Sequence, residues 1–434
     1  MKARVVVLSL ILATTLLAGV SALDWGGTVD NSTTAAYTFS DPDALLLQKD
    51  KLALWVVNQF TPVFKLTVQG SFTYTYENPK PDYPYLPDID LLHLSGELTL
   101  GTRRNSLLGY TLGRFFVNDF SGSVLADAID GIKLDWSTWL ANVTLAVGYS
   151  GLRFDQASGI NISWADFNNT ELFAPPRLIG LLGAEFPSLF LNQDLNTVFL
   201  MQQDFRTGDE VLDEGTAAEE FGKGGRLSTQ YIGAGIDGNL ARSLYYRFFA
   251  YLGTGQNLSY IDGEYQYEWI LATLLSASLQ YFNEDLMFSR AELGLRFASG
   301  DADFSDSVIE GNREGLATVF VPITNNDIAL VFSPRLANLM LLEASYSIKP
   351  LRELQTQLKG FVFLRPTTGP ISDLRVDGDS IYLGSEVDII ARYRPLSDLG
   401  LALSLGLFFP GKEAFTTGEE DPEFRGRLEI SFAF

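Results

Sequence analysis

The 434-residue sequence contains no cysteine and a single histidine, His93. The lack of cysteine excludes disulfides, thiolate zinc sites, iron–sulfur clusters and cysteine nucleophiles. A metal site built from several imidazoles is likewise excluded, and Ser–His–Asp catalysis would depend on His93 alone. After residue 17 the chain also lacks any stretch that approaches the ~20 apolar residues of a membrane-spanning helix.

Basic residues are outnumbered, because 31 lysines and arginines face 53 aspartates and glutamates and leave a formal net charge of −22. A chain this acidic is a poor ligand for nucleic acid, so no nucleic-acid partner is expected. The acidic residues gather in three segments, 204–220, 301–314 and 413–423. Three interpretations of these segments are open. The charges keep the loops soluble and apart, they line a charged vestibule, or they bridge divalent cations to an anionic surface. None has full EF-hand spacing, so neither a metal site nor a cofactor is predicted.

The N-terminus has the organisation of a secretory signal. Lys2 and Arg4 precede an uncharged apolar run at 5–17, and small residues follow up to Ala22. This pattern predicts a signal peptide at 1–22, cleaved after Ala22, and a single domain at 23–434. Because no cysteine follows the run, a lipoprotein anchor is excluded.

The C-terminal segment 383–434 carries the clearest structural pattern. Leucines recur at every second position from Leu399 to Leu407, and the last segment alternates apolar and charged residues up to the final Phe434. In 383–394 one side holds Leu383, Ser385, Val387, Ile389, Ala391 and Tyr393, and the other holds Gly384, Glu386, Asp388, Ile390, Arg392 and Arg394. A period of two is typical of β-strands whose two faces meet different surroundings.

These strands are about 11 residues or longer, which suits a tilted crossing of a bilayer better than a soluble sandwich. The charged face cannot lie against lipid, and the leucine face is not expected to lie in water. A transmembrane β-barrel with apolar side chains outward and polar ones toward a wet lumen meets both conditions.

The same two-faced pattern recurs upstream and predicts an all-β, antiparallel transmembrane barrel of about 18 strands, with a range of 14 to 18. Short turns alternate with long polar loops, as this class of barrel requires. The predicted strands are 25–38, 51–60, 63–76, 90–100, 105–117, 128–136, 139–150, 178–191, 196–203, 228–237, 243–253, 267–282, 286–299, 338–348, 352–364, 381–395, 399–409 and 423–434.

With the leucine face outward, charged residues of both signs fall on the inward face. This set comprises Arg290, Glu292, Arg296, Lys359, Glu386, Asp388, Arg392, Arg394, Arg425, Arg427 and Glu429. One interpretation is an Arg/Glu network that ties the inner wall together. The other is a basic surface that favours passage of anions. The two are compatible, because arginines in excess of the acids remain available to solutes.

Several short motifs resemble the alginate-export porins and, more loosely, the 18-stranded substrate-specific porins. They are residues 112–115 (LGRF), 130–132 (DGI), 148–152 (GYSGL), 384–388 (GSEVD) and 408–411 (FFPG). The resemblance implies that Arg114, Glu386, Asp388 and Arg392 face the lumen. The strongly acidic composition departs from those families, so export of a polyuronate is not inferred.

We therefore expect an outer-membrane channel for small hydrophilic solutes, anions among them, with segment 300–337 as a candidate constriction. Its expected partners are outer-membrane lipid, solutes in the lumen and the barrel-assembly machinery, which would read the strand ending at Phe434. One alternative is a plugged transporter for hydrophobic substrates, and another is a surface adhesin acting through acidic loops. An enzyme is not expected, since His93 and Ser95 lie ~7 Å apart along a strand, too far for a ready hydrogen bond.

Overall fold

The computed structural model describes residues 23–39, 41–61, 63–77, 84–100, 106–160, 172–190, 192–207, 211, 225–303, 312, 315–372, 375–376, 378–416 and 419–434. The predicted signal peptide, 1–22, lies outside these ranges, as do most acidic residues of 204–220 and 304–311. No helix among the described residues is long and apolar enough to cross a membrane.

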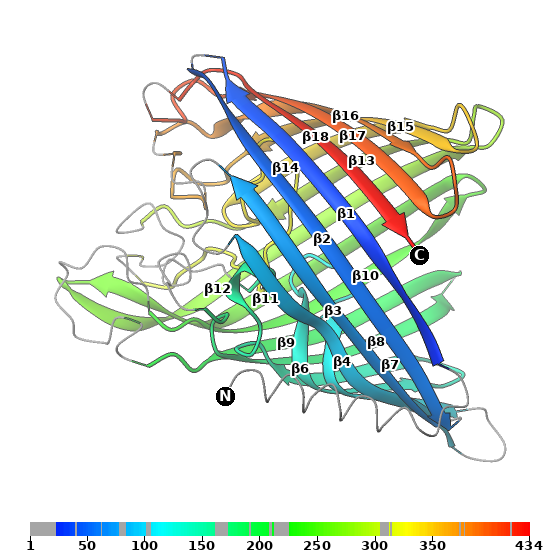
Figure 1. The fold of residues 1–434 in the computed structure, drawn as a ribbon. Coiled ribbons are helices and arrows are strands. Elements are labelled where there is room, and N and C mark those ends of the chain that lie inside the picture. Colours follow the sequence, from blue (N-terminus) through cyan, green and yellow to red (C-terminus); the bar gives the residue numbers. More distant parts are fainter. Residues whose placement is uncertain are drawn as a thin grey trace.

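The chain forms one antiparallel sheet of 18 strands, as the alternation predicted (Figure 1). The strands are β1 (Leu23–Thr38), β2 (Asp41–Thr61), β3 (Phe64–Glu77), β4 (Tyr85–Leu100), β5 (Ser106–Asn118), β6 (Ala126–Ser137), β7 (Asn142–Tyr149), β8 (Arg177–Phe190), β9 (Gln193–Asp204), β10 (Ser228–Ala241), β11 (Leu244–Ile261), β12 (Glu264–Asn283), β13 (Ser289–Ala298), β14 (Leu339–Ile348), β15 (Leu354–Leu364), β16 (Tyr382–Tyr393), β17 (Leu399–Pro410) and β18 (Glu423–Ala433).

The sheet closes on itself. Each strand pairs with its neighbours in sequence, and β1 pairs with β18 in a register that runs from Thr28 opposite Ala433 to Thr38 opposite Glu423. The last residue continues this seam, because Phe434 and Gly27 exchange two backbone hydrogen bonds of 3.0 Å. Closure leaves no sheet edge with unpaired backbone groups, which is the condition for a sheet to cross lipid.

The two faces of the wall separate as the sequence predicted. Leu293 and Leu295 on β13 and Leu403 on β17 are among the many exposed apolar side chains on the outer side. Residues that alternate with them, such as Glu292 and Ser404, point inward. The wall is therefore apolar toward lipid and mixed toward the lumen.

Two hairpins are longer than predicted. β2 begins at Asp41 rather than at 51, and β11 and β12 continue to a tight turn at Asp262 and Gly263. Both turn residues have positive φ, the backbone geometry that an Asp-Gly turn provides. These extensions are rich in polar residues, so backbone pairing continues beyond the point where the apolar alternation ends. The other long connections also follow odd-numbered strands, so in this antiparallel barrel they leave the wall at the same end as these two hairpin turns (Figure 1).

Candidate functional site

All but one of the predicted pore-lining side chains lie on the inner side of the wall. Each alternates along its strand with outward apolar residues, as Lys359 does with the exposed Leu358 and Arg427 with the exposed Leu428. The inner set is Arg290, Glu292, Arg296, Lys359, Glu386, Asp388, Arg392, Arg394, Arg425, Arg427 and Glu429.

Arg114 is placed differently. It shares its side of β5 with Leu112 and Phe116, which are both exposed on the outer face. Its guanidinium contacts Asp130 on β6, with Nη2 2.8 Å from Oδ2, and it donates to the carbonyl oxygens of Ile89 and Leu152. Arg114 therefore holds the wall together where β4 and β5 separate, and the lumen-facing prediction is corrected. The resemblance on which it rested could not fix the side of the strand.

The described residues 315–338 of the connection between β13 and β14 contact the inner wall of the barrel, within the segment 300–337 that was a candidate constriction. Glu386 on β16 accepts the backbone N–H groups of Val331 and Phe332 at 2.7 and 2.8 Å. Asp388 accepts the N–H of Leu330 at 3.3 Å, and Arg425 on β18 donates to the Leu330 carbonyl at 2.9 Å. These three predicted pore residues thus anchor residues 330–332, which we call the anchored segment.

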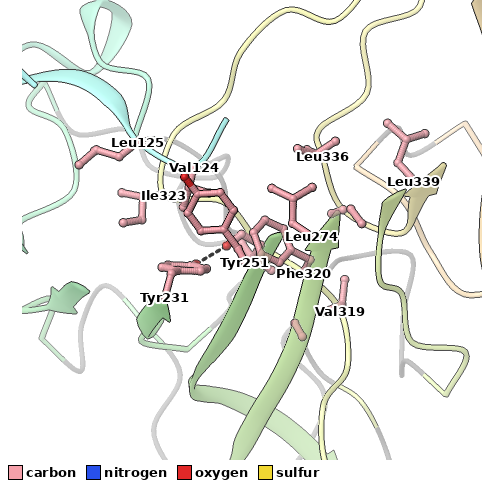
Figure 2. Close-up of a cluster of buried hydrophobic side chains, with 14 of the residues drawn as sticks. Val124, Leu125, Tyr231, Tyr251, Leu274, Val319, Phe320, Ile323, Leu336 and Leu339 are labelled. Carbon is pink, nitrogen blue, oxygen red and sulfur yellow. Dashed lines mark hydrogen bonds between the residues drawn. The ribbon is translucent and has the colours of Figure 1, made fainter. Parts of the chain in front are cut away.

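Around the anchored segment, apolar side chains of the loop and of the inner wall pack against each other. Phe332 stacks on Phe408 of β17 with ring centroids 4.5 Å apart and meets Phe363 of β15 edge-on at 5.0 Å. Figure 2 shows the central part of this cluster, in which Phe320 lies beside Tyr251 and Leu274. The hydroxyl of Tyr231 donates to the carbonyl of Val321. Loop and wall are one packed unit here.

The apolar cluster covers only part of the wall. Among the described residues it draws on β5–β17 and on the loops between them, and it includes none from β18 or β1–β4. Most inward side chains of that remaining wall are polar: Lys51 lies 3.2 Å from Asp90, which also accepts hydrogen bonds from Gln69 and Ser71. This strip, which we call the polar wall, is the part of the inner wall that the apolar cluster does not cover.

At the short-turn end the polar wall opens into a cavity of about 760 Å³. Six basic and three acidic side chains line it: Lys49, Lys51, Lys349, Arg352, Arg392, Arg394, Asp30, Glu353 and Glu429. Within the described ranges no carboxylate lies at ion-pair distance from Arg392 or Arg394, and the weak contact of Arg392 is to the amide oxygen of Gln357 at 3.5 Å. Solvated guanidinium groups of this kind are available to an anion.

Other predicted residues pair with each other. Arg290 contacts Glu292 at 2.7 Å between Nη2 and Oε2, and Lys359 lies 3.7 Å from Glu343. These pairs correspond to the network interpretation. A second cavity of about 710 Å³ lies against β8–β13, and its lining includes Asp194 and Asp237.

Neither His93 nor any cluster of metal-binding side chains forms a reactive site in the described residues. His93 points inward, and its Nδ1 lies 3.0 Å from the backbone carbonyl oxygen of Arg114. No group of three or more histidine, aspartate or glutamate side chains within the described ranges could hold a metal ion.

Sequence reasoning missed the two lysines Lys49 and Lys51. The predicted strand began at 51, which left Lys49 in a loop and gave Lys51 no assigned face. Both lysines alternate with the outward Leu52 and Leu54, and this signal would have placed them on the inner wall.

Comparisons with known proteins agree with this architecture. No protein-family model and no curated protein sequence matches the chain. Among solved structures, it resembles OccK5 (OpdH) of Pseudomonas aeruginosa, with a TM-score of 0.58 and 10% identity over 96% of this chain and 99% of that one. OccAB2 of Acinetobacter baumannii gives the same four values. OccK11 (OpdR) of Pseudomonas aeruginosa has a TM-score of 0.55 and 11% identity over 96% of each chain. The chain thus shares the fold of these structures, and identities of 10–11% support no conclusion beyond the fold.

Proposed function

We propose that this protein is an outer-membrane channel that passes small hydrophilic, anionic solutes by diffusion along the polar wall. The observation that carries the proposal is the cavity of about 760 Å³ in which six basic side chains face three acidic ones. Positive side chains around a passage lower the electrostatic barrier for anions and raise it for cations. The strand ending at Phe434 would direct the chain to the barrel-assembly machinery, and the apolar outer band would hold it in outer-membrane lipid.

Arg392→Glu should reduce the anion preference of the purified, refolded protein in planar bilayers. The substitution changes the local charge by two units, and at ~8 Å in water each unit alters the energy of a passing ion by about 0.5 kcal/mol. The anion-to-cation permeability ratio should therefore fall about fivefold or more. Reversal potentials in a salt gradient near 0.1 M measure this ratio. At that concentration the Debye length is about 10 Å, so the charge of residue 392 still acts on a passing ion.

Lys412→Glu is the matched control, because it makes the same charge change on an exposed loop residue outside the cavity. Its permeability ratio should stay near that of the wild type. Cation selectivity in the wild type would contradict the proposal and would indicate that the acidic loops determine which ions pass. A silent bilayer from folded protein would instead favour the plugged transporter, a candidate supported by the apolar cluster across β5–β17.

A further inference from the structure

A polar group of four side chains lies inside the apolar band on the outer face of the barrel. It comprises Asn31 and Thr33 on β1 with Gln48 and Asp50 on β2, and we call it the β1–β2 patch. These residues alternate with the inward Ser32 and Lys49, and they share their side with the exposed Val29, Leu46 and Leu52. In Figure 1, β1 and β2 cross the front of the barrel.

The four side chains form a hydrogen-bonded network. Asn31 donates its amide to Oδ1 of Asp50 at 2.6 Å, and Gln48 donates to Oδ2 at 2.9 Å. The Thr33 hydroxyl lies 3.4 Å from the amide oxygen of Asn31. The network uses only part of the hydrogen-bonding capacity of each group, because each amide has a second N–H and the carboxylate has further lone pairs.

The β1–β2 patch lies near the middle of the membrane-spanning zone. Asn31 is six residues from both Trp25 and Tyr37, the exposed aromatic side chains toward the two ends of β1. At 3.3 Å per residue and a tilt of about 45°, this places it about 14 Å along the membrane normal from each. Across the seam with β18, Asn31 and Thr33 stand opposite Ile430 and Leu428, both exposed apolar residues.

Lipid chains offer no hydrogen-bond partner, so a carboxylate and two amides at this depth are unfavourable unless protein covers them. The other outward-facing charges of the wall follow this rule, because Arg114 and Asp130 neutralise each other. Within the described ranges no basic side chain lies at ion-pair distance from Asp50. The patch therefore needs a polar partner, and a single barrel does not supply one.

We propose that a second copy of this chain packs across the β1–β2 patch, related by a two-fold axis along the membrane normal. The patch is self-complementary, because Asn31 and Gln48 offer donors and Asp50 offers acceptors that the copy can exchange. Ala35, an exposed small residue on the same outward face of β1, allows close approach of the two walls there. The dimer buries each Asp50 carboxylate against the amides of the other copy. This proposal is independent of the solute that the lumen carries.

The absence of native cysteine permits a direct test by single-cysteine cross-linking in the native outer membrane. Thr33→Cys, oxidised with copper phenanthroline, should give a disulfide-linked dimer. Ile232→Cys, an exposed residue on the outer face of β10, should stay monomeric under the same conditions. Equal cross-linking of both variants, or none at Thr33→Cys, would overturn the proposal.

A second measurement tests whether the polar side chains of the β1–β2 patch hold the dimer together. The triple variant Asn31→Leu, Gln48→Leu and Asp50→Leu keeps a β-strand pattern, and its folded barrel can be verified by heat-modifiable mobility on gels. Detergent-solubilised wild type should have the mass of two chains by light scattering, and the triple variant should dissociate at least tenfold more readily. A wild-type protein with the mass of one chain, or a triple variant as dimeric as the wild type, would contradict the two-fold interface.

Discussion

Glu386→Ala should raise the single-channel conductance of the barrel several-fold. The Glu386 carboxylate accepts the backbone N–H groups of Val331 and Phe332, and both donors are buried. Hydrogen bonds to a charged group contribute about 1.5–3 kcal/mol each, so losing two destabilises the anchored segment by about 3–6 kcal/mol. The ratio of detached to anchored loop rises about 100-fold or more as a result. A detached segment leaves the lumen wider between β16 and β18.

The control for this experiment is Glu343→Ala. Glu343 is an inward carboxylate on the neighbouring wall, 3.7 Å from Lys359, and it makes no hydrogen bond to the anchored segment. Both substitutions remove one carboxyl group from the inner wall, and only one of the two groups contacts the loop, so a difference between them reports the position of the loop. Equal conductance in the two variants would show that the anchored segment does not restrict the passage. Glu386→Gln, whose amide oxygen can still accept one bond, should lie between wild type and Glu386→Ala.

The number of strands could be read from the sequence because a membrane barrel imposes the same local rule on every strand. Side chains must alternate between lipid and lumen, and the alternation in 383–394 or 399–409 reports this without knowledge of any partner strand. The lengths of the hairpins could not be read in this way. The ends of β2, β11 and β12 extend where polar residues occur on both faces, so their pairing depends on backbone hydrogen bonds that leave no periodic signal.

The sequence predicted which side chains face inward, but it did not predict which of them the loop covers. Alternation placed Glu386, Asp388 and Arg425 inward, yet nothing in their own strands indicates that residues 330–332 return to cover them. Contacts between a loop and a distant strand depend on packing across the lumen, which a local pattern does not encode. Arg114 is a different case, because it shares its side of β5 with the exposed Leu112 and Phe116, and its lumen-facing prediction came from the resemblance and not from the alternation.

Asp204→Asn should destabilise the barrel strongly, although it is nearly isosteric. Asp204 ends β9 and is buried with Arg177 and Arg206, whose guanidinium groups both contact its carboxylate. It also accepts the backbone N–H of Leu227 at 3.1 Å, which joins the end of β9 to the start of β10. Removing the charge leaves two buried cations with less compensation, at a cost of about 3–5 kcal/mol. The folded form should therefore be lost at a clearly lower temperature in heat-modifiability gels.

Asp135→Asn makes the same chemical change at a solvated ion pair and separates burial from charge. Asp135 lies 3.1 Å from Lys133 on the inner face of β6, and its side chain is 41% exposed. Exposed pairs contribute about 0–1 kcal/mol, so this variant should unfold at nearly the wild-type temperature. If both variants behaved alike, the Asp204 cluster would be as solvated as the Lys133 pair, and β8–β10 would depend on backbone pairing alone. A large difference instead means that the loop end of the barrel is fixed by buried charge, on the side of the lumen opposite the polar wall.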